Sequence, residues 1–194
     1  MRDSAVEYLL MRKHQKQRGF TLMELLIVIV LLGILATLGL SSFKSSQTKS
    51  RDAKRKGDLK GISTALEIYY NDKGKYPNDS ADGKIMGCGV GDVLECPWGG
   101  QFVDSNNTQY MPILVKDPTR GRHYFYDVAG GNQSYQIYAR LENTLDNDVQ
   151  KDPSDNPYAY SGLYCDDASS IQCNWGISSV NTSPNTGKTL VLEP

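Results

Sequence analysis

A glycine, an aromatic residue and a carboxylate mark the start of a long uncharged run. Gly19 precedes Phe20, and Glu24 follows four residues later. Cleavage after Gly19 would place a new α-amine on Phe20, and this cation could pair with Glu24 of an adjacent copy of the chain. The simpler interpretation is that Glu24 lies in the first turn of a helix, where the helix dipole favours an anion. Composition alone favours this simpler interpretation.

The uncharged run is the element that must position these residues. No charged residue occurs from Leu25 to Phe43, and a helix of this length spans roughly 29 Å, close to the ~30 Å hydrocarbon core of a bilayer. The run therefore predicts a transmembrane helix, in which every backbone group is paired internally. A carboxylate in lipid costs roughly 2.5–3.5 kcal/mol, so Glu24 is expected near the headgroups or beside a cation.

The sequence Gly19-Phe20-Thr21-Leu22-Met23-Glu24-Leu25-Leu26, with basic residues before it and an apolar run after it, resembles the class III signal of type IV pilins and type II secretion pseudopilins. The resemblance implies that a membrane peptidase cleaves after Gly19 and N-methylates the new terminal Phe20. It also implies that Glu24 directs filament assembly. The resemblance covers roughly the first third of the chain, and the remainder is similar only in layout.

Residues 1–19 are expected to be the leader peptide that is removed. Its basic residues place this end in the cytoplasm; they are Arg2, Arg12, Lys13, Lys16 and Arg18. Met11 begins a shorter alternative leader that holds most of this positive charge. A different interpretation is an ordinary secretory signal, because Gly39-Leu40-Ser41 offers the small residues of a general cleavage site and would leave Ser42 as the first residue.

A second helical pattern continues past the uncharged run. One apolar stripe at spacings of three and four consists of Leu59, Ile62, Leu66 and Tyr69, which predicts an amphipathic helix. The helix is expected to stop between Asn71 and Gly74, and Pro77 prevents its return. The expected organisation is leader (1–19), transmembrane and assembly helix (20–43), amphipathic continuation (44–74) and extracytoplasmic head (75–194).

Strand patterns appear late in the chain, after a glycine-rich region at 75–107 without sustained periodicity. Strands are predicted at 110–115, 123–128 and 134–142, with a hairpin turn at Ala129-Gly130-Gly131-Asn132-Gln133. In the last strand an apolar set alternates with Gln136, Tyr138, Arg140 and Glu142; this set is Tyr135, Ile137, Ala139 and Leu141. The apolar set is expected to face the helix stripe. The predicted fold class is α+β, a long N-terminal helix packed on a small antiparallel sheet.

Four cysteines follow the apolar run, and they could form three disulfide pairings. The two neighbouring pairs share a sequence separation of eight, which favours Cys88–Cys96 and Cys165–Cys173. Zinc is the rival interpretation, but paired zinc ligands usually have two to four residues between them. Disulfides in an oxidising, extracytoplasmic compartment are the favoured interpretation.

Charge is unevenly distributed along a chain whose net charge is −1. Residues 20–70 carry seven Lys and Arg against four Asp and Glu, whereas residues 71–194 carry nine against sixteen.

The basic cluster consists of Lys49, Arg51, Lys54, Arg55, Lys56 and Lys60. A nucleic-acid site is disfavoured because aspartates interrupt the cluster and no aromatic stacking platform lies beside it. A solvated helix face, or contact with the acidic head, is favoured. We also hypothesise that heads pack over the basic helices of neighbouring subunits.

The segment from Asn143 onwards, the acidic tail, suggests a cation site as a minority hypothesis. Its candidate ligands are Asp146, Asp148, Asp152 and Asp155. Oxygen-rich loops suit calcium, and the resemblance adds that major pseudopilins bind calcium in a comparable loop. Aspartates in turns, however, are mostly turn formers, so the expected cofactor is none, with calcium as the alternative.

Catalytic constellations are not evident. Beyond the leader the only histidine is His123, and a Ser/His/Asp arrangement needs a base with an orienting partner. The sequence contains no His-Glu-x-x-His, Cys-x-x-Cys or phosphate-binding Gly-rich loop with Lys. An enzyme is therefore not expected.

The expected function is that of a structural subunit of a type IV pilus-like filament. The alternative is a type II secretion pseudopilin. A less favoured alternative is a secreted or membrane-anchored binding protein with an ordinary signal peptide. Expected partners are further copies of the chain, the prepilin peptidase and methylase, an assembly ATPase and inner-membrane platform proteins. The protein is expected in the inner membrane as a single span with its N-terminus inside, and then in an extracellular pilus or a pseudopilus.

Overall fold

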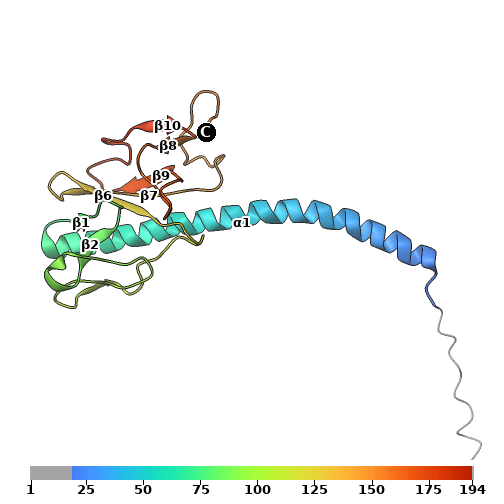
Figure 1. The fold of residues 1–194 in the computed structure, drawn as a ribbon, viewed down its shortest axis with the longest axis horizontal. Coiled ribbons are helices and arrows are strands. Elements are labelled where there is room, and N and C mark those ends of the chain that lie inside the picture. The colour runs from blue at the N-terminus through green and yellow to red at the C-terminus, as the bar shows by residue number, and fades with distance from the viewer. Residues whose placement is uncertain (1–18, 194) are drawn as a thin grey trace, which may run out of the picture. The chain divides into compact units, whose positions relative to one another are not determined.

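A computed structural model describes residues 19–193, without the side chains of residues 38–42. The leader residues 1–18, including the basic positions and Met11, lie outside this range. The chain divides into an N-terminal unit, residues 1–44, and a head unit, residues 45–194. The predicted α+β class is confirmed, with one long helix and ten short strands in the described residues (Figure 1).

Helix α1 runs from Leu22 to Lys73. It ends where the sequence predicts, because Gly74 adopts a φ of 70° and donates its N–H to the Tyr70 carbonyl at 2.8 Å. A left-handed residue after the last turn is a common way to satisfy terminal carbonyls, and glycine adopts it without a Cβ clash. Pro77 follows, as expected.

The part of α1 in the N-terminal unit exposes its apolar side chains. From Leu22 to Leu35 the large apolar residues are between 47% and 89% exposed. By hydropathy and length, no helix in the described part of the chain qualifies as a membrane span. The predicted span, Leu25 to Phe43, includes the five residues whose side chains are not described. Ser41 and Ser42, at the alternative secretory cleavage site, are among them.

The main sheet of the head unit is antiparallel and three-stranded, in the order β6–β7–β9. Its strands are β6 (Phe125–Ala129), β7 (Ser134–Ala139) and β9 (Trp175–Ser178). The predicted hairpin is confirmed: Phe125 pairs with Tyr138 and Ala129 with Ser134. The turn contains Gly130 and Gly131 at φ 62° and 67°, values that suit glycine.

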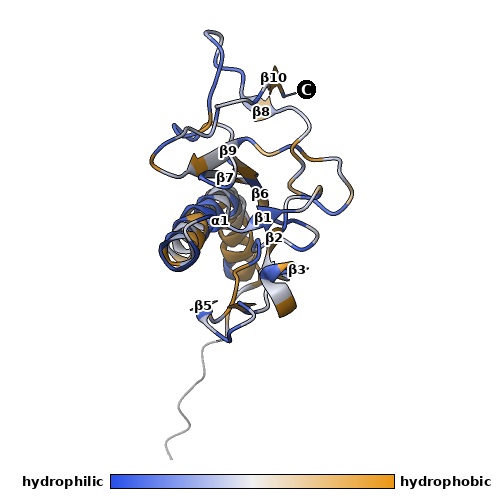
Figure 2. Cartoon of the chain, turned by 90° about the vertical axis from the view of Figure 1, so that its left-hand side faces the viewer, coloured by the Kyte–Doolittle hydropathy of each residue, from blue (hydrophilic) through white to orange (hydrophobic). Residues whose placement is uncertain are grey.

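This sheet packs against α1 through one buried cluster. The helix supplies the predicted stripe, and β7 supplies Tyr135, Ile137 and Ala139. These positions alternate along β7, so their side chains lie on one face. The predicted contact between the helix stripe and the apolar face is confirmed. Figure 2 shows β6, β7 and β9 beside α1, with β8 (Tyr158–Tyr160) and β10 (Leu190–Leu192) on the far side of the sheet.

The opposite face of the main sheet is also covered, which the alternating pattern did not predict. Tyr138 packs with Tyr160, Leu163, Cys165 and Cys173 in a second cluster. Gln136 is buried and donates to the carbonyls of Ser183 and Thr186 at 2.6 and 2.9 Å. The C-terminal segment therefore forms a further layer, whose strands β8 and β10 pair antiparallel.

The glycine-rich region contains short strands where the sequence predicts loops. Strands β1 (Asn78–Asp79), β2 (Ile85–Cys88) and β3 (Leu94–Glu95) form one small sheet, and β4 (Phe102–Val103) pairs with β5 (Gln109–Met111). A short 3-10 segment, η2, spans Val90–Asp92. Strands of two to four residues are too short to produce a readable periodicity.

Three predicted strand boundaries are wrong. The strand predicted at 110–115 ends at Met111, because Pro112 has no N–H for a ladder. The strand predicted at 123–128 begins at Phe125, since His123 instead donates its N–H to the Cys165 carbonyl. The strand predicted at 134–142 ends at Ala139, because Leu141 donates its N–H to the Asn174 side chain at 2.7 Å.

Candidate processing and assembly site

The Gly19–Phe20 junction lies before the helix, in exposed backbone. Helix α1 begins at Leu22, and no atom comes within 4 Å of a Cβ built on Gly19. Phe20 is 87% exposed. A peptidase needs access to its substrate bond, and Phe20 on one side of this junction is accessible.

Glu24 lies in the first turn of α1 and forms a reciprocal cap with Thr21. Its Oε2 accepts the Thr21 N–H and hydroxyl, both at 2.8 Å, while the Glu24 N–H donates to Thr21 Oγ1 at 3.1 Å. This is the capping-box geometry, which satisfies two otherwise unpaired groups of the helix end. Glu24 thus has the simpler, local role within one chain, and its predicted pairing with the Phe20 amine of another subunit stays a prediction.

Three of the six residues of the basic cluster on α1 pair with carboxylates; they are Arg51, Arg55 and Lys56. Arg55 is fully buried and binds Asp117 through Nε at 2.7 Å and Nη2 at 2.9 Å. It also binds Asp52 at 2.7 Å and Glu142 at 2.8 Å, so its guanidinium is surrounded by anions. Arg51 forms a two-pronged ion pair with Glu142. Contact with the acidic head was one of the two favoured interpretations of this cluster.

These pairings lie within one chain, and the packing of heads over neighbouring helices stays a prediction. Lys49, Lys54 and Lys60 stay exposed and form no ion pair among the described residues, whereas Arg55 and Lys56 bind the head of their own chain. The exposed lysines are available for a complementary contact with a neighbouring head. The pairing of Arg55 with Asp117 joins residues 62 apart, and no local pattern indicates it.

The ion pairs shift the pKa values of the groups that they join. Hydrogen bonds from Arg51, and then from Arg55, lower the pKa of Glu142 to about 2. Burial opposes charging of Arg55, but the bonds from Asp117 and Glu142 prevail and raise its pKa. Glu142 and Arg55 therefore both stay charged at neutral pH.

Each of the four aspartates proposed as calcium ligands already has a partner within the chain. Asp146 and Asp148 both bind Lys56, and Asp155 pairs with Lys151 at 3.1 Å. Asp152 accepts the backbone N–H groups of Ser154 and Asn156, both at 2.8 Å. Among the described residues, no group of three or more His, Cys, Asp or Glu side chains is placed to hold a metal ion. These residues do not fit a calcium site.

The four cysteines form the two disulfides that the spacing favours. Cys88 bonds Cys96 and Cys165 bonds Cys173. The first closes the β2–β3 region, and the second closes the segment that covers the outer face of the main sheet. Each stabilises a loop-rich region that has little regular structure.

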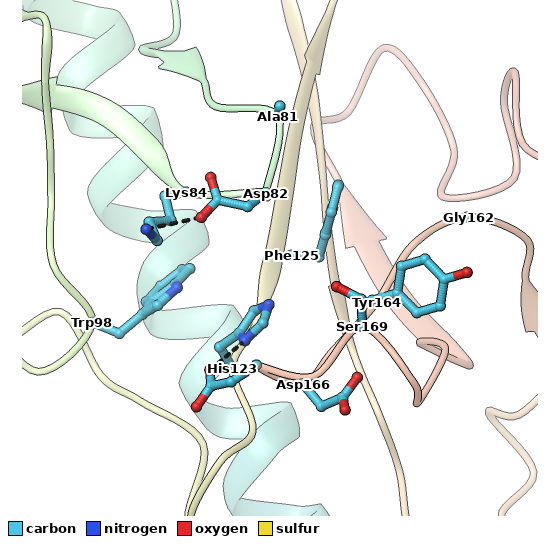
Figure 3. A pocket seen from close by; sticks show the side chains of 11 residues that line it. Ala81, Asp82, Lys84, Trp98, His123, Phe125, Gly162, Tyr164, Asp166 and Ser169 are labelled. Atoms are coloured by element: carbon cyan, nitrogen blue, oxygen red, sulfur yellow. Dashed lines mark hydrogen bonds and ion pairs between the residues drawn. The ribbon is translucent and has the colours of Figure 1, made fainter.

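His123 lines a pocket of about 330 Å³ in the head unit (Figure 3). Its Nδ1 lies 3.2 Å from Asp167 Oδ1, while Trp98, Phe125 and Tyr164 supply aromatic walls. Ser169 lines the same pocket, but its hydroxyl is not hydrogen-bonded to His123 in the structure. The base thus has an orienting carboxylate but no bound nucleophile, so this arrangement is not a catalytic triad.

Comparison with known proteins extends the similarity beyond the N-terminus. The family described as the prokaryotic N-terminal methylation motif matches residues 14–40. The type II secretion system core protein G of Pseudomonas aeruginosa is 31% identical over 128 residues, covering 66% of this chain and 84% of the relative. The protein of the same name in Escherichia coli is 30% identical over 128 residues, covering 66% and 83%.

A pilus protein matches over a shorter length. The type IV major pilin protein PilA of Myxococcus xanthus is 37% identical over 65 residues, covering 34% of this chain and 30% of the relative. No solved structure matches the chain.

The long capped helix, the exposed junction before it and the antiparallel head define a pilin-like subunit. The chain belongs to the family of type IV pilins and type II secretion pseudopilins, whose members are structural subunits and not enzymes. Within this family, the similarity to core protein G of Pseudomonas aeruginosa extends over 128 residues and the similarity to the pilin over 65.

Proposed function

We propose that the protein is a pseudopilin of a type II secretion system. The observation that supports this most is the 128-residue similarity to core protein G, which is far longer than the N-terminal unit of 44 residues and so includes part of the head. A type IV pilus subunit, the function first expected from the sequence, is the second candidate, and the similarity to a major pilin over 65 residues favours it.

The assembly route follows from the N-terminal segment. A prepilin peptidase cleaves after Gly19 and methylates Phe20, and the segment Leu25–Phe43 holds the subunit in the inner membrane, with the head outside. The subunits then polymerise through α1. An assembly ATPase and a membrane platform protein supply the energy and the scaffold. The match to the N-terminal methylation motif supports the processing step.

Glu24 supplies the assembly contact in this proposal. Its Oε2 is bound by Thr21, which leaves Oε1 without a hydrogen bond among the described residues. That oxygen can accept a hydrogen bond from the Phe20 amine of an adjacent subunit. In a low-dielectric surrounding such a pair is strongly favoured over two separated charges.

Replacing the chromosomal copy with Glu24→Ala tests the function. We expect cleavage to leave a methylated Phe20, as measured by mass spectrometry. We also expect that the filament built from this subunit is absent and that the export of folded proteins falls at least tenfold. Surface pili, which this proposal assigns to other subunits, should persist. Asp72→Ala is the control, because it removes an exposed carboxylate near the other end of α1 and should leave assembly intact.

Three outcomes would contradict the proposal in different ways. Normal filaments from Glu24→Ala would remove the assembly role of that carboxylate. Loss of surface pili with normal export would identify a pilus subunit instead. A mature chain that begins at Ser42 would show an ordinary secretory signal and contradict membership of a filament.

A further inference from the structure

The loop that follows β7 carries the first two aspartates of the acidic tail, and one lysine of α1 binds both. The Lys56 ammonium lies 2.7 Å from Asp146 Oδ1 and 2.5 Å from Asp148 Oδ2. Asp146 Oδ1 also accepts the Asp148 N–H at 3.0 Å. The two carboxylates therefore converge on one cation, which the protein itself supplies.

The surroundings of Lys56 hold the ammonium in place. Its side chain is 28% exposed, and its Nζ lies 5.9 Å from the centre of the Trp175 ring, within the range of a cation–π contact. Burial of Asp146 opposes its ionisation, but the hydrogen bond from Lys56 prevails and lowers its pKa. The pair is thus ionised at neutral pH.

The preceding turn of the same helix fixes the start of the loop. Asp52 Oδ1 accepts the Glu142 N–H at 2.9 Å, and Asp52 Oδ2 accepts the Asn143 N–H at 2.8 Å. Asp52 is itself held by Arg55. Asp52 therefore binds the first residues of the loop through its carboxylate. Lys56, one turn later, binds the two aspartates of the loop through its ammonium.

We infer that Lys56 is the resident cation of the loop 142–148, and that this loop takes its fold without a divalent metal. Two carboxylates that lie close together repel each other unless a cation offsets their charge. Here the lysine offsets it. A calcium ion at Asp146 and Asp148 would have to displace the ammonium and would leave it close to the added positive charge. The inference does not depend on whether the filament serves secretion or a pilus.

Thermal unfolding of the full chain in detergent tests this inference. The unfolding midpoint of the unaltered protein should be the same with a calcium chelator and with millimolar calcium. Lys56→Met should lower the midpoint by several degrees and speed proteolysis within 142–151, whereas Lys56→Arg should stay close to the unaltered protein. Lys60→Met is the matched control, because Lys60 is exposed on the same helix and forms no ion pair among the described residues.

Two results would overturn the inference. A fall of the midpoint on chelation, or a rise with calcium, would show that the metal and not Lys56 orders the loop. Equal midpoints and equal proteolysis rates for Lys56→Met and Lys60→Met would show that the ammonium does not hold the loop. The proteolysis readout is local, so it separates loop opening from a global loss of stability.

Discussion

At the scale of single residues, the sequence identified the chemistry near Gly19, Phe20 and Glu24 but not the long-range partners of Arg55. The first three lie within six positions, so their spacing carries the information. In the sequence, Arg55 is one residue of a basic cluster. In the structure it is buried against carboxylates that lie far along the chain. Such pairings depend on tertiary packing, and one sequence contains no signal for them.

Arg55→Met should be the most destabilising single change in the basic cluster. It would leave Asp117, Asp52 and part of Glu142 without their cation, and an uncompensated buried charge costs about 3–5 kcal/mol. Urea unfolding of the full chain measures this difference. Lys54→Met is the control because Lys54 is exposed one position away. Equal stabilities for the two variants would mean that the network contributes little.

At the scale of elements, the sequence predicted the helices and strands whose patterns repeat over several residues. It did not predict the very short strands or the covering of the second sheet face. The helix stripe and the β6–β7 hairpin were found because each repeats over several residues. The two-residue strands β1, β3 and β4 give no pattern to detect. The alternating pattern gave no indication that the C-terminal segment covers Gln136 and Tyr138, because that contact joins residues nearly fifty positions apart.

Removing the second disulfide should loosen this covering segment. Cys165 and Cys173 are fully buried against Tyr138 and Tyr160, so Cys165→Ser with Cys173→Ser loses both a cross-link and apolar packing. Loss of a native disulfide from a small domain typically costs about 2–5 kcal/mol. Thermal unfolding measures the loss, and alkylation with mass spectrometry checks that Cys88–Cys96 still forms. An unchanged midpoint would contradict this role.

At the scale of the whole chain, opposite charges are separated in sequence and joined in the fold. The basic part of α1 binds carboxylates from Asp117 to Asp148 within the head unit. A second contact near the end of the helix joins Lys73 to Asp92 and Asp104 at 2.9 and 2.7 Å. The helix and the rest of the head unit are thus connected by ion pairs as well as by the apolar core.

The head should lose stability in acid. Arg51 and Arg55 lower the pKa of Glu142 to about 2, and Lys73, against the effect of burial, lowers that of Asp104 to about 2. These groups stabilise the fold above their ordinary pKa values near 4, and the contribution is lost as pH falls towards 2. Burial raises the pKa values of Asp58 and Asp79, which opposes the trend. Urea unfolding between pH 6 and pH 2 should show a net decrease, and a flat profile would contradict it.

The two disulfides also affect the order of events during folding. Each joins cysteines only eight residues apart, so neither has to wait for a distant part of the chain. Both can therefore close soon after their own segment reaches an oxidising compartment, and a wrong pairing between the two regions would require a far longer loop to close. Each disulfide can therefore form without the noncovalent contacts between α1 and the late strands.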